Sequence, residues 1–201
     1  MNREMEFWRP RLVNGGAKRI MKGLDYGHQQ LYLPLVDAWG LNLLRTDRII
    51  EFGCGPCGLA PWFQVPLRRE GVEPMADDFK HLGINYGDLG FDQVHAETAQ
   101  QFIMQHYQGE MFDLAICCNA LDHDPQPGEM LRAIAKTARA LFVCYDLRFV
   151  ATELHPGLTV GGLDLPAPWK CTRQDEISMA RWPEMLKEVK ARRCQLWERA
   201  A

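Results

Sequence analysis

A short apolar segment, RIIEF at residues 48–52, runs directly into the glycine-rich stretch GCGPCG at residues 53–58. An apolar run that ends at glycines predicts a buried strand and a tight turn, and the following residues predict the start of a helix. Two kinds of protein use such a turn. Cys54-Gly55-Pro56-Cys57 has the spacing of a thioredoxin-type dithiol. Gly53-x-Gly55-x-x-Gly58 has the spacing of a nucleotide-binding turn.

Strand and helix patterns alternate through the chain beyond this turn. Further strands are predicted at residues 71–74, 91–96, 112–118 and 141–147, and helices at residues 31–39 (interrupted at Pro34), 59–70, 98–107 and 127–140. This alternation predicts an α/β fold, namely a Rossmann-like, doubly wound and mostly parallel sheet with helices on both faces. Right-handed crossovers then gather the carboxyl ends of the strands on one rim, where ligands of such sheets bind.

The organisation favours a single domain over residues 1–201, because the chain has no repeats and no linker. We divide it into an N-terminal helical segment (1–47), a ligand-binding core (48–148) and a C-terminal loop and helix (149–201). Residues 182–199 predict one amphipathic basic helix, which would pack on the body or on a second subunit, so a homodimer stays open.

Composition favours a protein of the cytoplasm. No apolar run approaches the roughly 20 residues that cross a bilayer, and the first residues lack the apolar segment of a secretory signal. The odd number of cysteines, seven, favours reduced thiols over a disulfide framework. The net charge of −3 includes +4 over residues 1–22 and +3 over residues 181–201. Such basic ends could bind an anionic substrate or nucleic acid, but solvated helix faces explain them as well.

The neighbours of the glycine turn favour nucleotide binding over a dithiol. A thioredoxin-like domain needs a proline well downstream that faces the two sulfurs, and no proline has a suitable position here. Glu73 ends the second predicted strand, where a carboxylate can accept from ribose hydroxyls. Glu51, two residues before Gly53, would repel a pyrophosphate and favours a ligand with a positive group, such as an ammonium or a sulfonium.

These segments resemble those of the class I methyltransferases, which use S-adenosylmethionine. IIEFGCGPCG resembles the first motif of that family, GVEP the second-strand motif and FDLAICCNALDH the fourth-strand motif, so the resemblance covers residues 48–148. It is greatest to the enzymes that methylate small molecules. Two departures are Cys57, where the family usually has glycine, and KTARALFVC, which lacks the Pro-Gly-Gly turn common before the fifth strand.

The resemblance implies a cofactor site around the first turn. Gly53 and Gly55, with Cys54 between them, would line the methionine part of S-adenosylmethionine, and Glu51 would help to hold its ammonium group. Glu73 would accept from both ribose hydroxyls. Each acid taken singly also has a structural explanation, as a partner of a turn or of a helix end.

Two further cofactor residues follow from the same resemblance. Glu97 would lie near the adenine amino group, although it could equally flank the helix that begins at Thr98. Asn119, just past the fourth predicted strand, would face the cofactor and the methyl acceptor.

The tip of the fourth strand bears on the acceptor. Asn119-Ala120-Leu121-Asp122 lacks the Pro-Pro-aromatic sequence of enzymes that methylate exocyclic amines, and Cys117-Cys118 lacks the proline of cytosine C5 enzymes. We therefore predict Asp122 and His123 as catalytic residues, with His123 as the base that deprotonates or orients a hydroxyl or acid acceptor. Alternatively, DHDP caps the helix that begins near Gln126. His155 is a second candidate base.

The N-terminal segment lies where the family builds its substrate lid. Some of its residues could line an acceptor pocket or meet an anionic group, although such aromatics more often pack; they are Phe7, Trp8, Tyr26, Tyr32, Arg9 and Arg11. No metal is expected. Zinc at Cys54, Cys57, Cys117 and Cys118 is unfavourable, because adjacent strand residues face opposite sides of a sheet.

The sequence therefore predicts an S-adenosylmethionine-dependent enzyme that methylates a small molecule, with oxygen as the favoured acceptor atom. An RNA or protein methyltransferase is an alternative that rests on the basic ends, and nucleic acid is the less favoured partner. Two more hypotheses stay open, namely a catalytically idle subunit that binds S-adenosylmethionine and a thiol oxidoreductase. A membrane partner is not expected.

Overall fold

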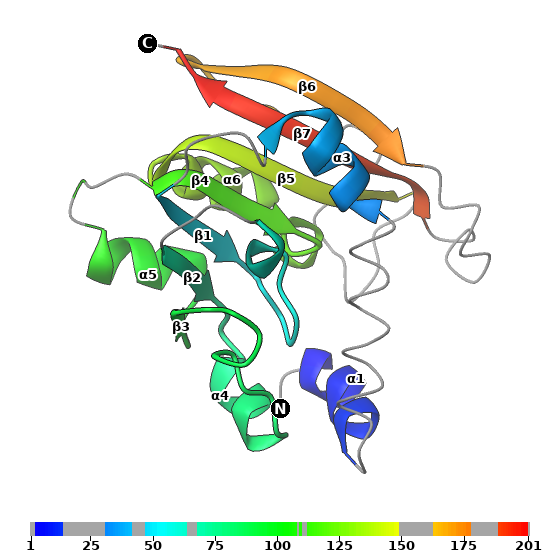
Figure 1. The fold of residues 1–201 in the computed structure, drawn as a ribbon. Helices are drawn as coiled ribbons and strands as arrows, with labels where there is room; N and C mark the ends of the chain where they lie inside the picture. The colour runs from blue at the N-terminus through cyan, green and yellow to red at the C-terminus, as the bar shows by residue number, and fades with distance from the viewer. Residues whose placement is uncertain are drawn as a thin grey trace.

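A computed structural model of the chain describes residues 3–13, 31–41, 47–63, 68–107, 109, 112–148, 163–177 and 189–200. These residues form a seven-stranded sheet in the order β3-β2-β1-β4-β5-β7-β6 (Figure 1). Its strands are β1 (Arg48–Phe52), β2 (Arg68–Val72), β3 (Gln93–His95), β4 (Phe112–Cys118), β5 (Ala138–Arg148), β6 (Trp169–Ile177) and β7 (Val189–Arg199). Strands β1 to β5 pair in parallel, and β7 lies antiparallel between β5 and β6.

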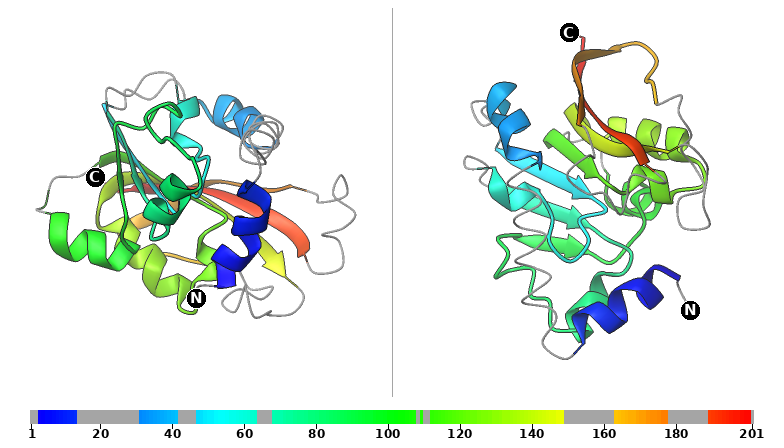
Figure 2. Two further views of the ribbon diagram at one scale, coloured as in Figure 1. Left: turned by 90° about the horizontal axis from the view of Figure 1, so that it is seen from below. Right: turned by 90° about the vertical axis from the view of Figure 1, so that its right-hand side faces the viewer.

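Helices pack on both faces of this sheet. One core contains residues of α1 (Arg3–Leu12), α3 (Leu33–Ala38), η2 (Ala60–Trp62) and α4 (Ala76–His81). The other contains residues of α5 (Ala99–His106), η3 (Leu121–His123) and α6 (Pro127–Ala135). Figure 2 shows α1 beside α4, at the end of the molecule away from β6 and β7. The predicted Rossmann-like α/β fold is confirmed, and no described helix is long and apolar enough to span a membrane.

Alternation along the strands divides their side chains between the two cores. Ile49 and Cys118 face the core of α1, α3 and α4, whereas Ile50 and Cys117 face the core of α5 and α6. Successive residues of a strand point to opposite faces, so Cys117 and Cys118 cannot converge on one ion. This separation agrees with the argument against a four-cysteine zinc site.

The helix predicted over residues 59–70 is wrong. In the described part of this range, residues 59–63 and 68–70, the short η2 is the only helical element, and β2 begins at Arg68, three residues before the predicted strand. Pro61 lies in the first turn of η2, where a proline is tolerated, so it does not explain the short length of this element. The start of β2 was not predicted because its charged residues do not have the pattern of a buried strand. Glu70 is nevertheless buried, and its charge is balanced by Arg68, whose Nε lies 2.8 Å from a Glu70 oxygen.

The basic helix predicted over residues 182–199 is also wrong, because residues 189–199 form β7. Cys194 and Leu196 enter one core and Trp197 enters the other, as the two-residue period of a strand requires. Arg192 belongs to no solvated face. It is 6% exposed and donates to Asp146 of β5 over 2.7 Å.

The remaining helices follow the prediction more closely. Pro34 lies in the first turn of α3 and therefore starts this helix instead of interrupting it. Helix α5 begins after Thr98, whose hydroxyl accepts from the Gln101 N–H, while the Gln101 side chain accepts from the Thr98 N–H. Helix α6 ends at Ala135, earlier than predicted, since β5 already begins at Ala138.

Candidate cofactor site at the strand tips

The glycine turn after β1 lies at the carboxyl end of that strand. Gly53 has φ 70° and Gly55 has φ 54°, values that glycine adopts without steric cost. A Cβ on Gly53 would lie 2.2 Å from the Cβ of Ala120, so the tip of β4 presses on the turn at this point. A Cβ on Gly55 would meet nothing within 4 Å. The turn is therefore closed toward β4 and open above Gly55.

Glu73 reaches this turn from the end of β2. Its side chain is buried, and one carboxylate oxygen accepts from the Gly55 N–H over 2.9 Å while the other accepts from the Met75 N–H over 3.0 Å. The Gly53 N–H donates to the carbonyl of Val72, the last residue of β2. The acid at the second strand tip therefore faces the first turn.

Glu51 lies beneath the same turn and is 2% exposed. The Leu59 N–H contacts both of its oxygens at 2.9 and 2.7 Å, and the Ala60 N–H contacts one at 2.7 Å. Burial raises the pKa of Glu51 to about 7, although these N–H bonds act in the opposite direction. The structure thus gives Glu51 a structural task, which is to hold the start of η2.

The two cysteines of the turn are buried. The Cys54 sulfur packs over Gly71 of β2, where a Cβ would lie only 2.9 Å from it. Burial raises the pKa of the Cys54 thiol well above its usual range, and the charges of Glu73 and Glu51 add to the shift. A redox dithiol instead needs a thiolate stabilised by its surroundings, so this environment argues against a thiol oxidoreductase.

Tyr86 steadies the turn from the segment between α4 and β3. Its hydroxyl donates to the Gly55 carbonyl over 2.9 Å, and its ring packs edge-on against Phe91. Sequence reasoning missed this contact, because no pattern in residues 82–90 indicates that a tyrosine in this segment contacts the first turn.

Glu97 and Asn119 lie in different surroundings. Glu97 follows β3, and its carboxylate contacts His106 Nε2 at 2.9 Å, so it is directed along α5. Asn119 is exposed at the tip of β4, where its N–H donates to the Cys144 carbonyl. Its φ of 56° makes it the one non-glycine residue with positive φ among the described residues, a conformation that asparagine tolerates better than most residues.

The two predicted catalytic residues have unequal access to solvent. Both belong to η3, but Asp122 is 1% exposed whereas His123 is half-buried. The charge of Asp122 acts on Arg192 and helps to raise the pKa of that guanidinium. The turn before α6 is instead bridged by Asp124, whose carboxylate accepts from the Gln126 N–H over 2.7 Å. Only His123 of the pair can meet an acceptor from solvent.

The residues proposed for a substrate lid also differ in their access to solvent. Tyr32 is 1% exposed, and its hydroxyl accepts from Arg192 over 2.8 Å, so it belongs to the interior. Trp8 packs edge-on against Phe79, and Phe7 lies under the Arg11 guanidinium. Tyr26 and His155 lie outside the described residues.

Comparison with known proteins gives a fold but no close relative. The sequence matches no protein-family profile, and no curated protein matches it in sequence. Magnesium protoporphyrin IX methyltransferase (ChlM) from Synechocystis PCC 6803, solved with bound SAM, superposes with a TM-score of 0.60 at 15% identity, covering 100% of this chain and 98% of that chain. An rRNA methylase from Escherichia coli superposes with a TM-score of 0.54 at 14% identity, covering 100% of this chain and 78% of that chain.

This chain has the fold of the class I S-adenosylmethionine-dependent methyltransferases. The fold predicted from the three motifs is thereby confirmed. At these identities the likeness establishes the fold alone, and both a small-molecule enzyme and an RNA enzyme share it.

Proposed function

We propose that this chain binds S-adenosylmethionine at the tips of β1 and β2 and transfers its methyl group to an oxygen of a small molecule. The observation that carries the proposal is the direction of Glu73, whose buried carboxylate reaches the Gly55 N–H from the second strand. The likeness to ChlM, a methyltransferase solved with bound SAM, supports the choice of cofactor and of acceptor class.

The residues at the turn fit an adenosyl ligand. The backbone is open above Gly55, which is what close approach of a ligand to a turn requires. The Glu73 carboxylate accepts from the Gly55 and Met75 N–H groups, so it is directed at the turn beside which the ribose of such a ligand would lie. Glu51 supports this turn from below through η2.

S-adenosylmethionine supplies an electrophilic methyl group when it is bound, so the chain has mainly to align an acceptor and exclude water. His123, half-buried at the tip of β4, is the proposed base that takes the proton of a hydroxyl acceptor. Asp122 is buried beside it, and we assign it a positioning role in η3. Asn119, exposed on the same tip, would face the acceptor.

RNA methylation is the second candidate, favoured by the likeness to an rRNA methylase. The basic C-terminal segment gives it less support than its composition suggests. Arg192 is paired with Asp146 in the interior, and Arg193 pairs with Glu176 of β6. These two charges are not available to phosphates without breaking an ion pair.

Calorimetry with S-adenosylmethionine and with NAD tests the cofactor. We expect the wild type to bind S-adenosylmethionine and not NAD, and Glu73→Gln to bind at least tenfold more weakly, a loss of about 1.4 kcal/mol. Asp77→Asn removes an exposed acid on α4 and is the matched control, with wild-type affinity expected. Thermal unfolding of Glu73→Gln separates lost binding from lost folding. If the wild type does not bind S-adenosylmethionine, the cofactor assignment is refuted.

Turnover with labelled S-adenosylmethionine tests the acceptor. Small molecules with a hydroxyl or a carboxylic acid group should accept the label. His123→Ala should lower turnover by about 10²–10⁴-fold while leaving cofactor affinity unchanged. Transfer to RNA, with binding that weakens steeply as salt rises, would select the second candidate. Cofactor binding without transfer to any acceptor would indicate an idle subunit.

A further inference from the structure

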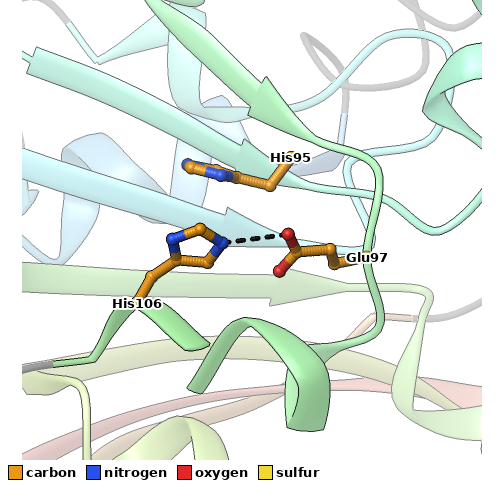
Figure 3. A group of neighbouring side chains, drawn as sticks. All are labelled: His95, Glu97 and His106. Carbon is orange, nitrogen blue, oxygen red and sulfur yellow. Dashed lines mark hydrogen bonds and ion pairs between the residues drawn. The ribbon is translucent and has the colours of Figure 1, made fainter. Parts of the chain in front are cut away.

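Three metal-ligating side chains meet at the outer edge of the sheet, beside β3. His95 ends β3, Glu97 follows it, and His106 ends α5. One nitrogen of each histidine and one Glu97 oxygen all lie within 4.8 Å of one another. Figure 3 shows the His95 imidazole lying over the pair formed by His106 and Glu97. Two imidazoles and one carboxylate therefore lie close enough together to be considered as ligands of one ion.

The spacing of these groups is close to that of a zinc site. Zinc bonds of about 2.0–2.1 Å at tetrahedral angles place ligand atoms about 3.3 Å apart. His106 Nε2 and Glu97 Oε1 lie 2.9 Å apart, so this pair has to open by only a few tenths of an ångström. A bound ion would replace the proton that His106 Nε2 shares with Glu97, and the neutral ring would then carry its proton on Nδ1. The ring centroids of His95 and His106 are 5.0 Å apart. A side-chain rotation would bring a nitrogen of His95, the third ligand, to bonding distance from the same ion.

Glu70 of β2 orients the His95 imidazole. A Glu70 oxygen lies 3.1 Å from His95 Nε2. Because a carboxylate only accepts, neutral His95 donates from Nε2, and Nδ1 then carries the lone pair that a metal requires. Arg68 and Arg48 also contact the Glu70 carboxylate, at 2.8 and 3.8 Å, and hold it beside His95.

We propose that the chain binds a divalent cation of the zinc class through His95, Glu97 and His106, with Glu70 as the positioning residue behind His95. A carboxylate that holds the second nitrogen of a ligating histidine is the usual outer partner in such sites. Two histidines and one carboxylate leave a fourth position for water or a ligand. The proposal assigns Glu97 to the metal site instead of the position near the adenine amino group that the resemblance implied. It does not depend on the methyltransferase function.

The site can be reached from solvent. His95 and His106 both line a pocket of about 420 Å³, and the His106 side chain is 41% exposed. Arg48 and Arg68 line the same pocket, and Glu70 pairs with both, so one of their two positive charges is balanced. An ion therefore has an entry path, which a genuine site needs.

Titration of the chelator-treated full chain with zinc chloride alone tests the proposal. We expect the wild type to bind one ion per chain, and His106→Ala to bind at least tenfold more weakly. His106 is partly exposed, so this variant should keep its fold, which circular dichroism checks. His81→Ala removes an exposed histidine of α4 and should bind as the wild type does. Glu70→Gln should weaken binding about 10–100-fold while its zinc stoichiometry stays the same.

Cobalt substitution distinguishes this site from the cysteines. Tetrahedral absorption bands without a thiolate-to-cobalt charge-transfer band are expected, and they should disappear in His106→Ala. A thiolate band would place the ion on cysteines and overturn the proposal. It is equally overturned if the wild type binds no zinc, or if His106→Ala binds with wild-type affinity.

Discussion

The tips of β1 and β2 and the interior between β5 and β7 both carry charged side chains, but they use them differently. At the first, Glu73 binds the backbone of a glycine turn that is open above Gly55. At the second, Arg192 donates to Asp146 and to Tyr32, and all three side chains are almost fully buried. One region offers polar groups beside open space, and the other encloses them.

This difference shows what marks a candidate site in such a fold. An acid near a strand end is not sufficient, because Asp146 and Glu51 also lie near strand ends and are enclosed by protein donors. The distinguishing feature of Glu73 is its partner, a turn N–H with free space above it. Substitutions should therefore affect stability in the enclosed region and cofactor affinity at the open one.

Arg192→Met should have the largest effect on stability. Removing the guanidinium leaves the Asp146 charge buried without its 2.7 Å partner, and breaking a buried pair from one side costs about 3–5 kcal/mol. Urea unfolding measures the loss in the free energy of unfolding. Arg173→Met, an exposed change on β6, should stay within about 0.5 kcal/mol of the wild type. A loss below about 1 kcal/mol for Arg192→Met would mean that the region is not enclosed.

Glu51→Gln should change how stability depends on pH. Burial raises the pKa of Glu51 from its ordinary value of 4.5 to about 7, so the folded state holds the proton more tightly than the unfolded state. The stabilisation from this proton is fully present below about pH 4.5 and is lost as the pH rises through 7. This difference between the two pKa values corresponds to about 3 kcal/mol in the free energy of unfolding.

Unfolding by urea at several values between pH 4.5 and 8 measures this effect. The wild type should lose stability relative to Glu51→Gln as the pH rises, whereas Glu129→Gln, an exposed change on α6, should give a curve parallel to the wild type. Parallel curves for Glu51→Gln would show that Glu51 is not enclosed, and the contrast with Glu73 would then disappear.

Sequence patterns predicted the parallel half of the fold well, because its central strands are buried on both faces. Residues 112–118 form β4 with the predicted bounds, and the strand before the glycine turn, β1, pairs in parallel with β2 and β4 as expected. The prediction for β7 failed for a physical reason. Arg192 is neutralised by Asp146 on another strand, and no local pattern reports a charge balanced from 46 residues away.

The candidate site was predictable only in part. The order of Glu51, the glycine turn and Glu73 predicted that these residues meet at one rim, since parallel strand ends share it, and the structure brings them together at the tips of β1 and β2. Which acid is enclosed beneath the turn was not predictable, because it depends on η2 lying over Glu51. The His95–Glu97–His106 group was missed because its last member is brought back by α5, whose end the sequence places only approximately.

The smallest expected effect separates the two glycines of the turn. Gly55→Ala should cost about 1 kcal/mol of unfolding free energy, the price of a left-handed conformation for a residue with a Cβ. Gly53→Ala should cost at least about 1 kcal/mol more, because overpacking adds to that strain where its Cβ would lie 2.2 Å from the Cβ of Ala120.

Calorimetry then tests what the open space above Gly55 is for. A methyl group there touches nothing in the protein, so it should weaken S-adenosylmethionine binding at least tenfold only if the ligand occupies that space. Asn85→Ala, a change in the segment before β3, serves as the control with wild-type affinity expected. If Gly55→Ala binds the cofactor as the wild type does, the open turn is not the binding surface, and the contrast between the two regions concerns stability alone.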